Sequence, residues 1–340
     1  MSILTKHTLE SHILGLASVF VLSSCSGANN AGSQGPRDSV YQNPYPAGDS
    51  INFQLVGQAS RKFLVYRPSQ VNRPRALIVV LHGGGGTGLD VANPGEHPLS
   101  AFRLVADSKN LMLVYPEGSP DIQGNPGWND CRSDAPAQSS GDDLSFLHAL
   151  VLQLQEQLQI ANSETFLAGT SNGAVMAFAF AFNFRNTLKA IAVSSGNLPA
   201  LPKNGPCGGG STAPLPIMLT HGTEDPAMPV NGGCVVNFQG FCNRGTVISQ
   251  QQTLNFWLSL NGLIGVTPNT SVVDINVSDQ GPAQKFFYPG STPLLYIKLI
   301  GAGHPVPSTS VLTSYSPTSG YQNRDLEFAQ EAWNFFETLN

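Results

Sequence analysis

The sequence predicts a single α/β domain built on a doubly wound, mostly parallel sheet with helices on both faces. Short and nearly uniformly apolar segments recur along the chain, and segments with helical spacing lie between them. Uniformly apolar strands are typical of a parallel sheet that is covered on both faces. We find no internal repeat and no second domain. The strands are expected at residues 63–68, 76–86, 111–118, 165–171, 189–196, 216–222 and 294–304.

Three segments are expected to be helices. Residues 142–158 carry leucine and valine at steps of three and four, and Asp142 can cap the first turn. Residues 324–339 repeat this spacing. The segment AFAFAFNF, residues 177–184, alternates with a period of two, as a strand would. A hairpin there would leave the parallel sheet without its crossover, so we predict a buried helix.

The composition indicates a globular protein with many turns. Of its 340 residues, 41% are hydrophobic, which is enough for a sizeable core. Only 11% are charged, against about 25% in typical soluble proteins. Glycine (35) and proline (25) are abundant, so long loops are expected. The net charge of −5 is unfavourable for nucleic-acid binding.

The N-terminal residues resemble an export signal. Residues 13–22 form an apolar run, about half of the roughly 20 residues that would span a bilayer. The following LSSC resembles a bacterial lipobox, which predicts cleavage before Cys25, its lipidation, and attachment to the cell envelope. Ordinary secretory cleavage is the alternative. We therefore expect a signal peptide at residues 1–25, a flexible tether at 26–49 and the folded α/β domain at 50–340.

Four further cysteines would meet an oxidising compartment after export, where an even number favours disulfides. Three pairings are possible. We favour Cys234 with Cys242, which are close in sequence, and this leaves Cys131 with Cys207. No C-x-x-C spacing supports a zinc site, so no metal is expected.

The stretch Gly-Thr-Ser-Asn-Gly, residues 169–173, stands between a predicted strand and the predicted buried helix. This is the arrangement of a nucleophile elbow, a sharp turn that exposes a serine hydroxyl above the sheet. Gly169 and Gly173 would fit where strand and helix approach too closely for larger side chains. Ser171 is therefore the candidate nucleophile, and a glycine-rich turn with an idle serine is the alternative.

A serine nucleophile needs a histidine base and a carboxylate that orients it. His304 follows the last predicted strand, in the place where the histidine of such a triad is expected. The acid should lie between Ser171 and His304 and after a strand, which indicates Asp225, with its neighbour Glu224 as a weaker candidate.

The glycine-rich stretch LHGGGGTG follows the predicted strand at residues 76–86 and resembles an oxyanion loop. We expect the backbone N–H groups of Gly84 and Asn172 to bind the oxyanion. A dinucleotide site is the rival interpretation, because the glycines also satisfy G-x-G-x-x-G. It is disfavoured because the loop runs on through Pro94 and Pro98 instead of opening a helix.

Five segments in the same order, GWNDC, DDLSFLHALV, GTSNGAVMA, HGTEDPAMP and NFWLSLNG, resemble the polyhydroxybutyrate depolymerase and feruloyl esterase family of α/β-hydrolases. The resemblance implies a serine esterase without a cofactor, with Trp128 and Asn129 at the acyl pocket. We also expect His82 to contact substrate. Val230 and Val306 stand where the family usually carries aromatic residues.

The function expected from the sequence is hydrolysis of carboxylic esters through a Ser-His-Asp triad. Feruloyl or acetyl esters of polysaccharide fragments are the expected substrates, because the two aromatic positions and a separate polymer-binding module are lacking. A polyester depolymerase is the alternative enzyme. A binding lipoprotein that keeps only the fold is the alternative from another class.

Overall fold

The computed structural model describes residues 41–56, 59–203, 213–237 and 239–339. The chain divides into two units, Met1–Val40 and Tyr41–Asn340, and the described residues belong to the second. The predicted signal peptide, Cys25 and most of the predicted tether therefore lie outside the described residues, as does Cys207.

The centre of the domain is one large sheet of ten strands, counted within the described residues. The five neighbouring pairs from β4 to β14 are parallel, whereas the strands at both edges pair antiparallel. All seven strands expected from the sequence form. In spatial order the sheet contains β1 (Gly48–Val56), β2 (Ala59–Arg67), β4 (Leu111–Pro116), β3 (Ala76–Leu81), β7 (Thr165–Thr170), β8 (Ala190–Ser194), β9 (Ile217–Gly222), β14 (Leu294–Leu299), β13 (Ala283–Tyr288) and β12 (Asn269–Val273).

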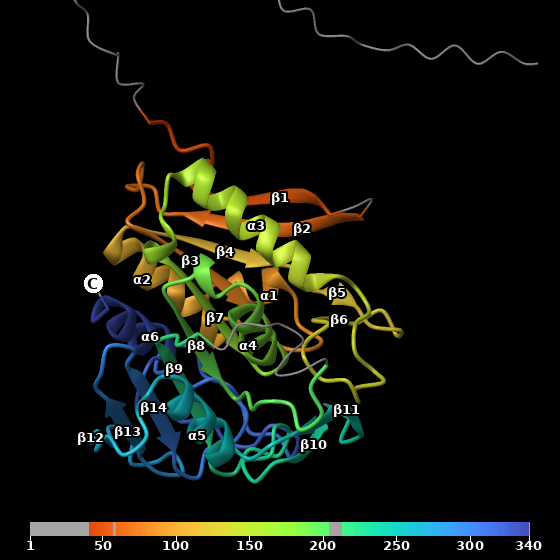
Figure 1. The fold of residues 1–340 in the computed structure, drawn as a ribbon, viewed down its shortest axis with the longest axis vertical. Coiled ribbons are helices and arrows are strands. Elements are labelled where there is room, and N and C mark those ends of the chain that lie inside the picture. The colour runs from red at the N-terminus through yellow and green to blue at the C-terminus, as the bar shows by residue number, and fades with distance from the viewer. Residues whose placement is uncertain (1–40, 57–58, 204–212, 238, 340) are drawn as a thin grey trace, which may run out of the picture. The chain divides into compact units, whose positions relative to one another are not determined.

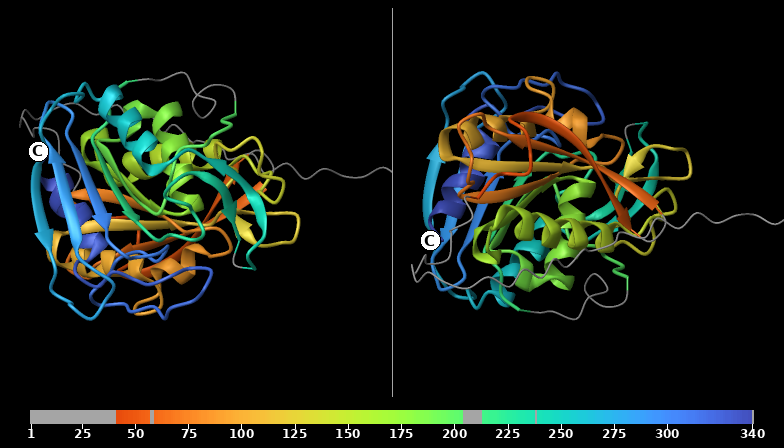
Figure 2. Two further views of the ribbon diagram at one scale, coloured as in Figure 1. Left: turned by 90° about the horizontal axis from the view of Figure 1, so that it is seen from below. Right: turned by 90° about the horizontal axis from the view of Figure 1, so that it is seen from above.

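Helices cover both faces of this sheet, as expected for an α/β-hydrolase fold (Figures 1 and 2). Helices α3, α4 and α5 contribute to one hydrophobic cluster, and α1, α2 and α6 to the other. Alternate residues of β3 belong to opposite clusters, Leu77 to the first and Ile78 to the second, because successive side chains of a strand point to opposite faces. The helices are α1 (Gly88–Ala92), α2 (Phe102–Lys109), α3 (Asp143–Leu158), α4 (Asn172–Asn183), α5 (Gln250–Leu260) and α6 (Phe328–Glu337), with short 3-10 turns at Pro98–Ala101, Asn162–Glu164 and Arg185–Thr187.

The alternating phenylalanine segment is helical, as predicted. It forms most of α4, which is buried nearly all round. Phe178 and Phe182, one turn apart, both pack on Trp257, with ring centroids 5.8 and 5.3 Å from it. Phe180 lies on another side of the helix, 6.4 Å from the His148 ring. Burial on every face explains why both Ala and Phe positions of this helix are apolar, so their alternation does not indicate a strand.

The other two predicted helices also form. The Asp142 carboxylate accepts a hydrogen bond from the Ser145 N–H at 3.1 Å, so it caps α3 as predicted. Helix α6 begins at Phe328, four residues later than its apolar spacing suggested.

The packed body begins earlier than the expected boundary at residue 50. Tyr45 is only 7% exposed and belongs to a core cluster, and its hydroxyl donates to Gln157 Oε1 at 2.6 Å. The Asn43 side chain donates to the Asn72 carbonyl at 2.9 Å. The composition of this region suggests a flexible tether, and the predicted boundary is therefore too late. A single buried aromatic ring is enough to anchor the segment to the core.

Among the described residues, two short hairpins lie outside the large sheet. One is formed by β5 (Ser119–Pro120) and β6 (Pro126–Gly127), the other by β10 (Gly233–Val236) and β11 (Cys242–Val247). Figure 1 shows both hairpins on the same side of the domain. A disulfide joins Cys234 to Cys242 across the second hairpin, which is the pairing favoured from the sequence. Within the described part of the chain, no helix is long and apolar enough to cross a membrane.

Candidate active site

Four strand-to-loop junctions bring the predicted residues to one edge of the sheet. Ser171 follows β7, Asp225 follows β9, His304 follows β14, and Gly84 lies in the loop after β3. These strands run parallel to one another, so their carboxyl ends meet at the same edge. The described structure therefore gathers residues that are far apart in the sequence.

The turn between β7 and α4 has the strained geometry of a nucleophile elbow. Ser171 has φ 55° and ψ −121°, a backbone conformation that L-residues rarely adopt. A Cβ atom added at Gly169 would lie 2.6 Å from the Gly173 carbonyl oxygen. A Cβ added at Gly173 would lie 2.4 Å from the His82 carbonyl oxygen. Both glycines are thus required for the close approach of strand, helix and glycine loop, as predicted.

His304 and Asp225 form a buried pair. The His304 Nδ1 atom lies 2.8 Å from Asp225 Oδ2 and 3.1 Å from Oδ1. Burial by itself would lower the pKa of His304, but the adjacent carboxylate outweighs it and raises the pKa above the ordinary value. Burial would raise the pKa of Asp225, and the imidazole outweighs this and lowers it. The pair therefore favours a charged carboxylate and an Nδ1–H tautomer, which leaves Nε2 of His304 as a base.

Backbone groups fix the Asp225 carboxylate. Its Oδ1 accepts hydrogen bonds from the N–H groups of Ala227 at 2.9 Å and Met228 at 2.8 Å. The weaker candidate, Glu224, is exposed and is not placed against the imidazole. The loop after β9 thus holds one carboxylate in a single orientation.

Two supporting residues were not identified from the sequence. His221 is fully buried, its Nε2 donates to the Met228 carbonyl at 2.9 Å, and this nitrogen lies 3.5 Å from Asp225 Oδ2. The Ser195 hydroxyl donates to the His304 carbonyl at 2.8 Å. His221 lies near the end of β9 and Ser195 follows β8, and no sequence motif indicated a role for either. In the structure, Ser195 has an unusual positive φ of 54°.

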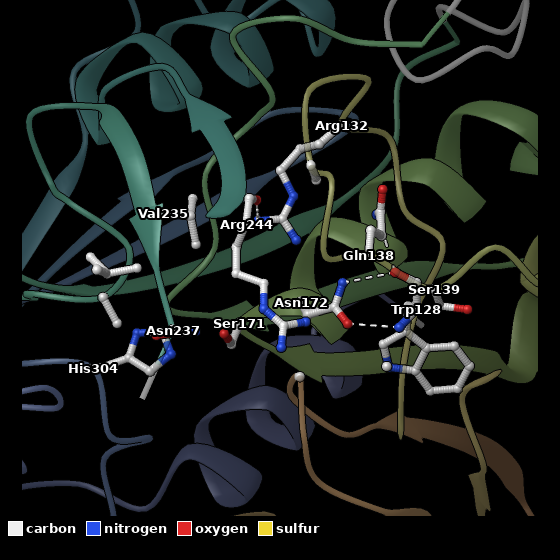
Figure 3. A pocket seen from close by; sticks show the side chains of 15 residues that line it. Trp128, Arg132, Gln138, Ser139, Ser171, Asn172, Val235, Asn237, Arg244 and His304 are labelled. Carbon is white, nitrogen blue, oxygen red and sulfur yellow. Dashed lines mark hydrogen bonds between the residues drawn. The ribbon is translucent and has the colours of Figure 1, made fainter. Parts of the chain in front are cut away.

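Ser171 and His304 line the same pocket (Figure 3). Among the residues that the structure describes, no hydrogen bond joins the serine hydroxyl to the imidazole. Nucleophile and base are often loosely placed without substrate and approach when it binds. The arrangement supplies the two groups that proton transfer from a serine requires.

The predicted oxyanion donors lie next to each other. A Cβ added at Gly84 would lie 3.6 Å from the Asn172 Cβ. Asn172 is the first residue of α4, so its N–H points out of the amino end of the helix. Within the described chain, the N–H groups of Gly84 and Asn172 have no hydrogen-bond acceptor. Two adjacent unpaired donors beside Ser171 can bind a developing negative charge.

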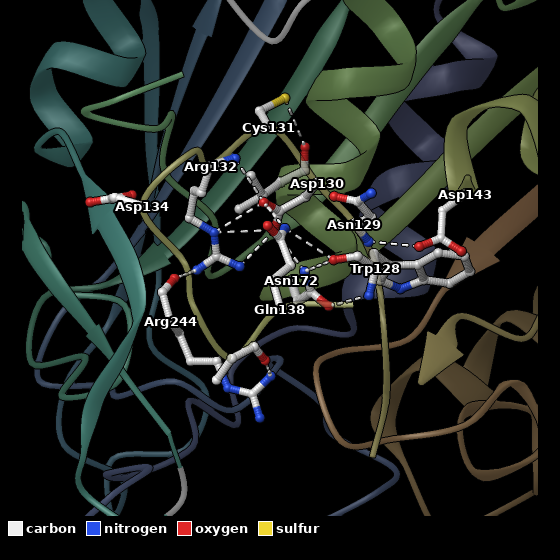
Figure 4. Close-up of polar contacts among 12 residues, drawn as sticks. Trp128, Asn129, Asp130, Cys131, Arg132, Asp134, Gln138, Asp143, Asn172 and Arg244 are labelled. Carbon is white, nitrogen blue, oxygen red and sulfur yellow. Dashed lines mark hydrogen bonds and ion pairs between the residues drawn. The ribbon is translucent and has the colours of Figure 1, made fainter. Parts of the chain in front are cut away.

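The Asn172 side chain is tied to the segment after β6 (Figure 4). Its Oδ1 accepts from the Trp128 N–H at 2.7 Å, and its Nδ2 donates to the Trp128 carbonyl at 3.1 Å and to Asp130 Oδ2 at 2.6 Å. The Trp128 indole N–H in turn donates to the His82 carbonyl at 2.8 Å. These bonds fix the amino end of α4 relative to the glycine loop.

The three predicted substrate contacts occupy different positions. Trp128 lines the pocket with Ser171, although its ring is buried. Asn129 lines a neighbouring cavity and accepts a hydrogen bond from Lys203.

His82 is fully buried, its Nδ1 bonds to the Gly83 carbonyl, and its Nε2 accepts from the Gly118 N–H. Burial lowers the pKa of His82 to about 4, so this neutral ring supports the loop and does not reach the pocket.

Several pocket residues carry no sequence signal. They come from the part of the loop after β6 that follows the GWNDC segment, and from the β10–β11 hairpin, which contains no recognisable motif. These residues are Arg132, Ala135, Gln138, Ser139, Val235, Val236, Asn237 and Arg244.

The sheet order, the helical layers and the elbow define an α/β-hydrolase. The chain belongs to the phospholipase/carboxylesterase family, whose family model matches residues 65–246. It is therefore a carboxylic ester hydrolase. The resemblance to feruloyl esterases drawn from the sequence is confirmed.

Three proteins that are similar to this chain are named as esterases. A probable feruloyl esterase C of Aspergillus flavus is 28% identical over 66% of this chain and 72% of its own length. An acetylxylan esterase of Coprinopsis cinerea is 26% identical over 50% of this chain and 46% of its own length. The solved structure of an acetyl xylan esterase from Aspergillus awamori has a TM-score of 0.53, with 16% identity over 76% of this chain and 95% of that protein. This structural likeness supports the fold.

Proposed function

We propose that the protein is an exported serine esterase in which Ser171 is the nucleophile, His304 the general base and Asp225 the residue that orients it. This proposal rests on the buried 2.8 Å contact between Asp225 and His304, because His304 lines the same pocket as Ser171. A strained serine, a base with a fixed tautomer and two unpaired N–H donors at one edge of a sheet suit acyl transfer.

The reaction follows from these positions. His304 Nε2 accepts the Ser171 proton while the serine oxygen attacks the ester carbonyl carbon. The carbonyl oxygen becomes an oxyanion that accepts hydrogen bonds from the N–H groups of Gly84 and Asn172. Protonated His304 then gives its proton to the leaving alcohol, and an acyl-enzyme remains. Water, deprotonated by His304, hydrolyses the acyl-enzyme and regenerates Ser171.

The proposed substrates are feruloyl or acetyl esters of polysaccharide fragments. Similarity to proteins named feruloyl esterase and acetylxylan esterase supports this class. Hydrolysis of a panel of aryl acetates and hydroxycinnamate esters tests it directly. A chain that cleaves solid polyester granules faster than these soluble esters would instead be a depolymerase.

Replacement of the nucleophile tests the mechanism. We expect Ser171→Ala to lower kcat by about 10⁴- to 10⁶-fold with an unchanged melting temperature. A fluorophosphonate probe should label the wild-type protein at Ser171 and should not label the variant. Ester hydrolysis by Ser171→Ala at the wild-type rate would show that another group is the nucleophile.

Export is part of the proposal and rests on the N-terminal sequence and on the disulfide between Cys234 and Cys242, which suits an oxidising compartment. We propose that Cys25 carries the lipid. Cys25→Ser should then move the protein from the membrane fraction to a soluble fraction, since each buried CH₂ of a lipid chain contributes about 0.8 kcal/mol to anchoring. Recovery of the wild-type protein in the soluble fraction would contradict lipidation.

A further inference from the structure

The pocket beside Ser171 has a positively charged wall. Two arginines, Arg132 and Arg244, line it, and no Asp or Glu is among its lining residues in the described part of the chain. The carboxylates that pair with these arginines, Asp130 and Asp121, lie behind the wall with side chains 0% and 1% exposed. A ligand in the pocket can therefore meet an arginine guanidinium without meeting its counterion.

All three guanidinium nitrogens of Arg132 already donate hydrogen bonds within the protein. Its side chain is 3% exposed, and its Nε and Nη2 atoms donate to the Asp130 carboxylate, the shortest contact being 2.6 Å. Its Nη1 donates to the Arg244 carbonyl oxygen. Arg132 thus holds β11 in position and has little capacity left for a ligand.

Arg244 is different because its guanidinium is only partly engaged. Its side chain is 21% exposed, with Nη2 at 3.3 Å from Asp121 Oδ2 and Nη1 donating to the Ala137 carbonyl at 3.0 Å. These contacts use two of the five N–H groups that a guanidinium carries. The other oxygen of this carboxylate, Asp121 Oδ1, accepts from the N–H groups of Gln123 and Asn125, each at 2.9 Å, so Arg244 shares the carboxylate with other donors.

The guanidinium lies beside the reacting centre. Nη1 of Arg244 is 4.0 Å from the position that a Cβ at Gly84 would take, and Figure 3 shows the side chain extending toward Ser171 and Asn172. A group bound to Arg244 would thus be only a few bonds away from the ester carbonyl. Arginine suits this role because its planar donors match the two oxygens of a carboxylate.

We infer that Arg244 selects esters that carry a carboxylate close to the scissile bond, on either the acyl or the alcohol part. This inference rests on the proposed function, since it assumes that the ester is cleaved at Ser171. Acidic carbohydrate esters, such as acetylated uronic acids, have this chemistry on the alcohol side, and half-esters of dicarboxylic acids have it on the acyl side.

Matched substrate pairs test the inference. The acyl arm compares 4-nitrophenyl hemisuccinate with 4-nitrophenyl butyrate, and the alcohol arm compares acetylated methyl glucuronoside with acetylated methyl glucoside. The measured quantity is the ratio of kcat/KM for the anionic ester to kcat/KM for its neutral partner. In at least one arm, Arg244→Met should lower this ratio by about 10- to 100-fold, the usual effect of losing a charge-assisted hydrogen bond.

Two further variants complete the test. Arg244→Lys keeps the charge and should lose only part of the ratio. Lys285→Met is the matched control, because Lys285 is 20% exposed in an ion pair with Glu331 away from the pocket, and its loss should not move the ratio. The arm in which the ratio falls identifies which part of the ester carries the carboxylate.

The possible failures are distinguishable. If the wild type cleaves the neutral esters and Arg244→Met leaves both ratios unchanged, the inference is wrong and the proposed function stands. A loss of kcat that is equal for neutral and anionic esters would make Arg244 an oxyanion contact instead. If the wild type cleaves none of these esters, the proposed function and the inference fail together.

Discussion

Gly173→Ala should damage both stability and catalysis, because the new Cβ would collide with rigid backbone. It would lie 2.4 Å from the His82 carbonyl oxygen and 2.7 Å from the Leu81 carbonyl oxygen, where ordinary contact begins near 3.4 Å. The overlap is about 1 Å, and neither partner is a flexible side-chain end. Relief requires α4 to move away from the glycine loop, which separates Asn172 from Gly84. We expect a loss of about 1–3 kcal/mol in the free energy of unfolding and a fall in kcat of about 100-fold.

Thermal unfolding and steady-state hydrolysis of a neutral aryl ester measure these two effects. Gly290→Ala is the matched control, since its Cβ would meet only the end of the Leu263 side chain, at 2.7 Å, on an exposed turn. The control should keep wild-type kcat and change the melting temperature little. A Gly173→Ala variant with wild-type stability and kcat would refute the close approach of elbow and glycine loop.

Two further perturbations test the imidazole and the disulfide-linked hairpin. The kcat/KM should fall as the pH drops through a pKa above the ordinary histidine value, because protonated His304 cannot accept the serine proton and Asp225 raises its pKa. Asp225→Asn should move this midpoint to lower pH and reduce the plateau by about 10³- to 10⁴-fold; an unmoved midpoint in the pH–rate profile would contradict the pairing. The double variant Cys234→Ser with Cys242→Ser opens a loop with a sequence separation of 8 and should cost about 2–3 kcal/mol of unfolding free energy. Calorimetry measures this loss, and an unchanged melting temperature would show that the disulfide does not constrain the fold.

The strands and the elbow were predictable because their signals are local. Uniform apolar runs mark β3, β4, β7 and β9, and the spacing of glycines around Ser171 records a steric requirement that the structure shows directly. The buried helix α4 needed one topological argument in addition to its pattern. The edge strand β12 and its neighbour β13 were not predicted, since partly exposed strands carry a weaker apolar signal.

The part of the pocket wall that the β10–β11 hairpin forms could not be predicted from local pattern. Arg244 and Asn237 line the same pocket as Ser171 only because a hairpin far along the chain folds beside the loop after β6. His82 illustrates the opposite case, since its position next to the glycines suggested a substrate contact. Its hydrogen bonds to Gly83 and Gly118 instead use both ring nitrogens within the protein. Partners of this kind are set by tertiary packing, which no motif records.

The β10–β11 hairpin contributes pocket residues from an element that is distinct from the strands carrying the proposed catalytic residues. Its strands pair with each other outside the central sheet, and it supplies Val235, Val236, Asn237 and Arg244 to the pocket. Ser171, Asp225 and His304 all come from the ends of central strands. Exchange of this disulfide-closed module is therefore a route to enzymes with new selectivity on an unaltered scaffold, and natural diversification of such a protein would concentrate in the same segment.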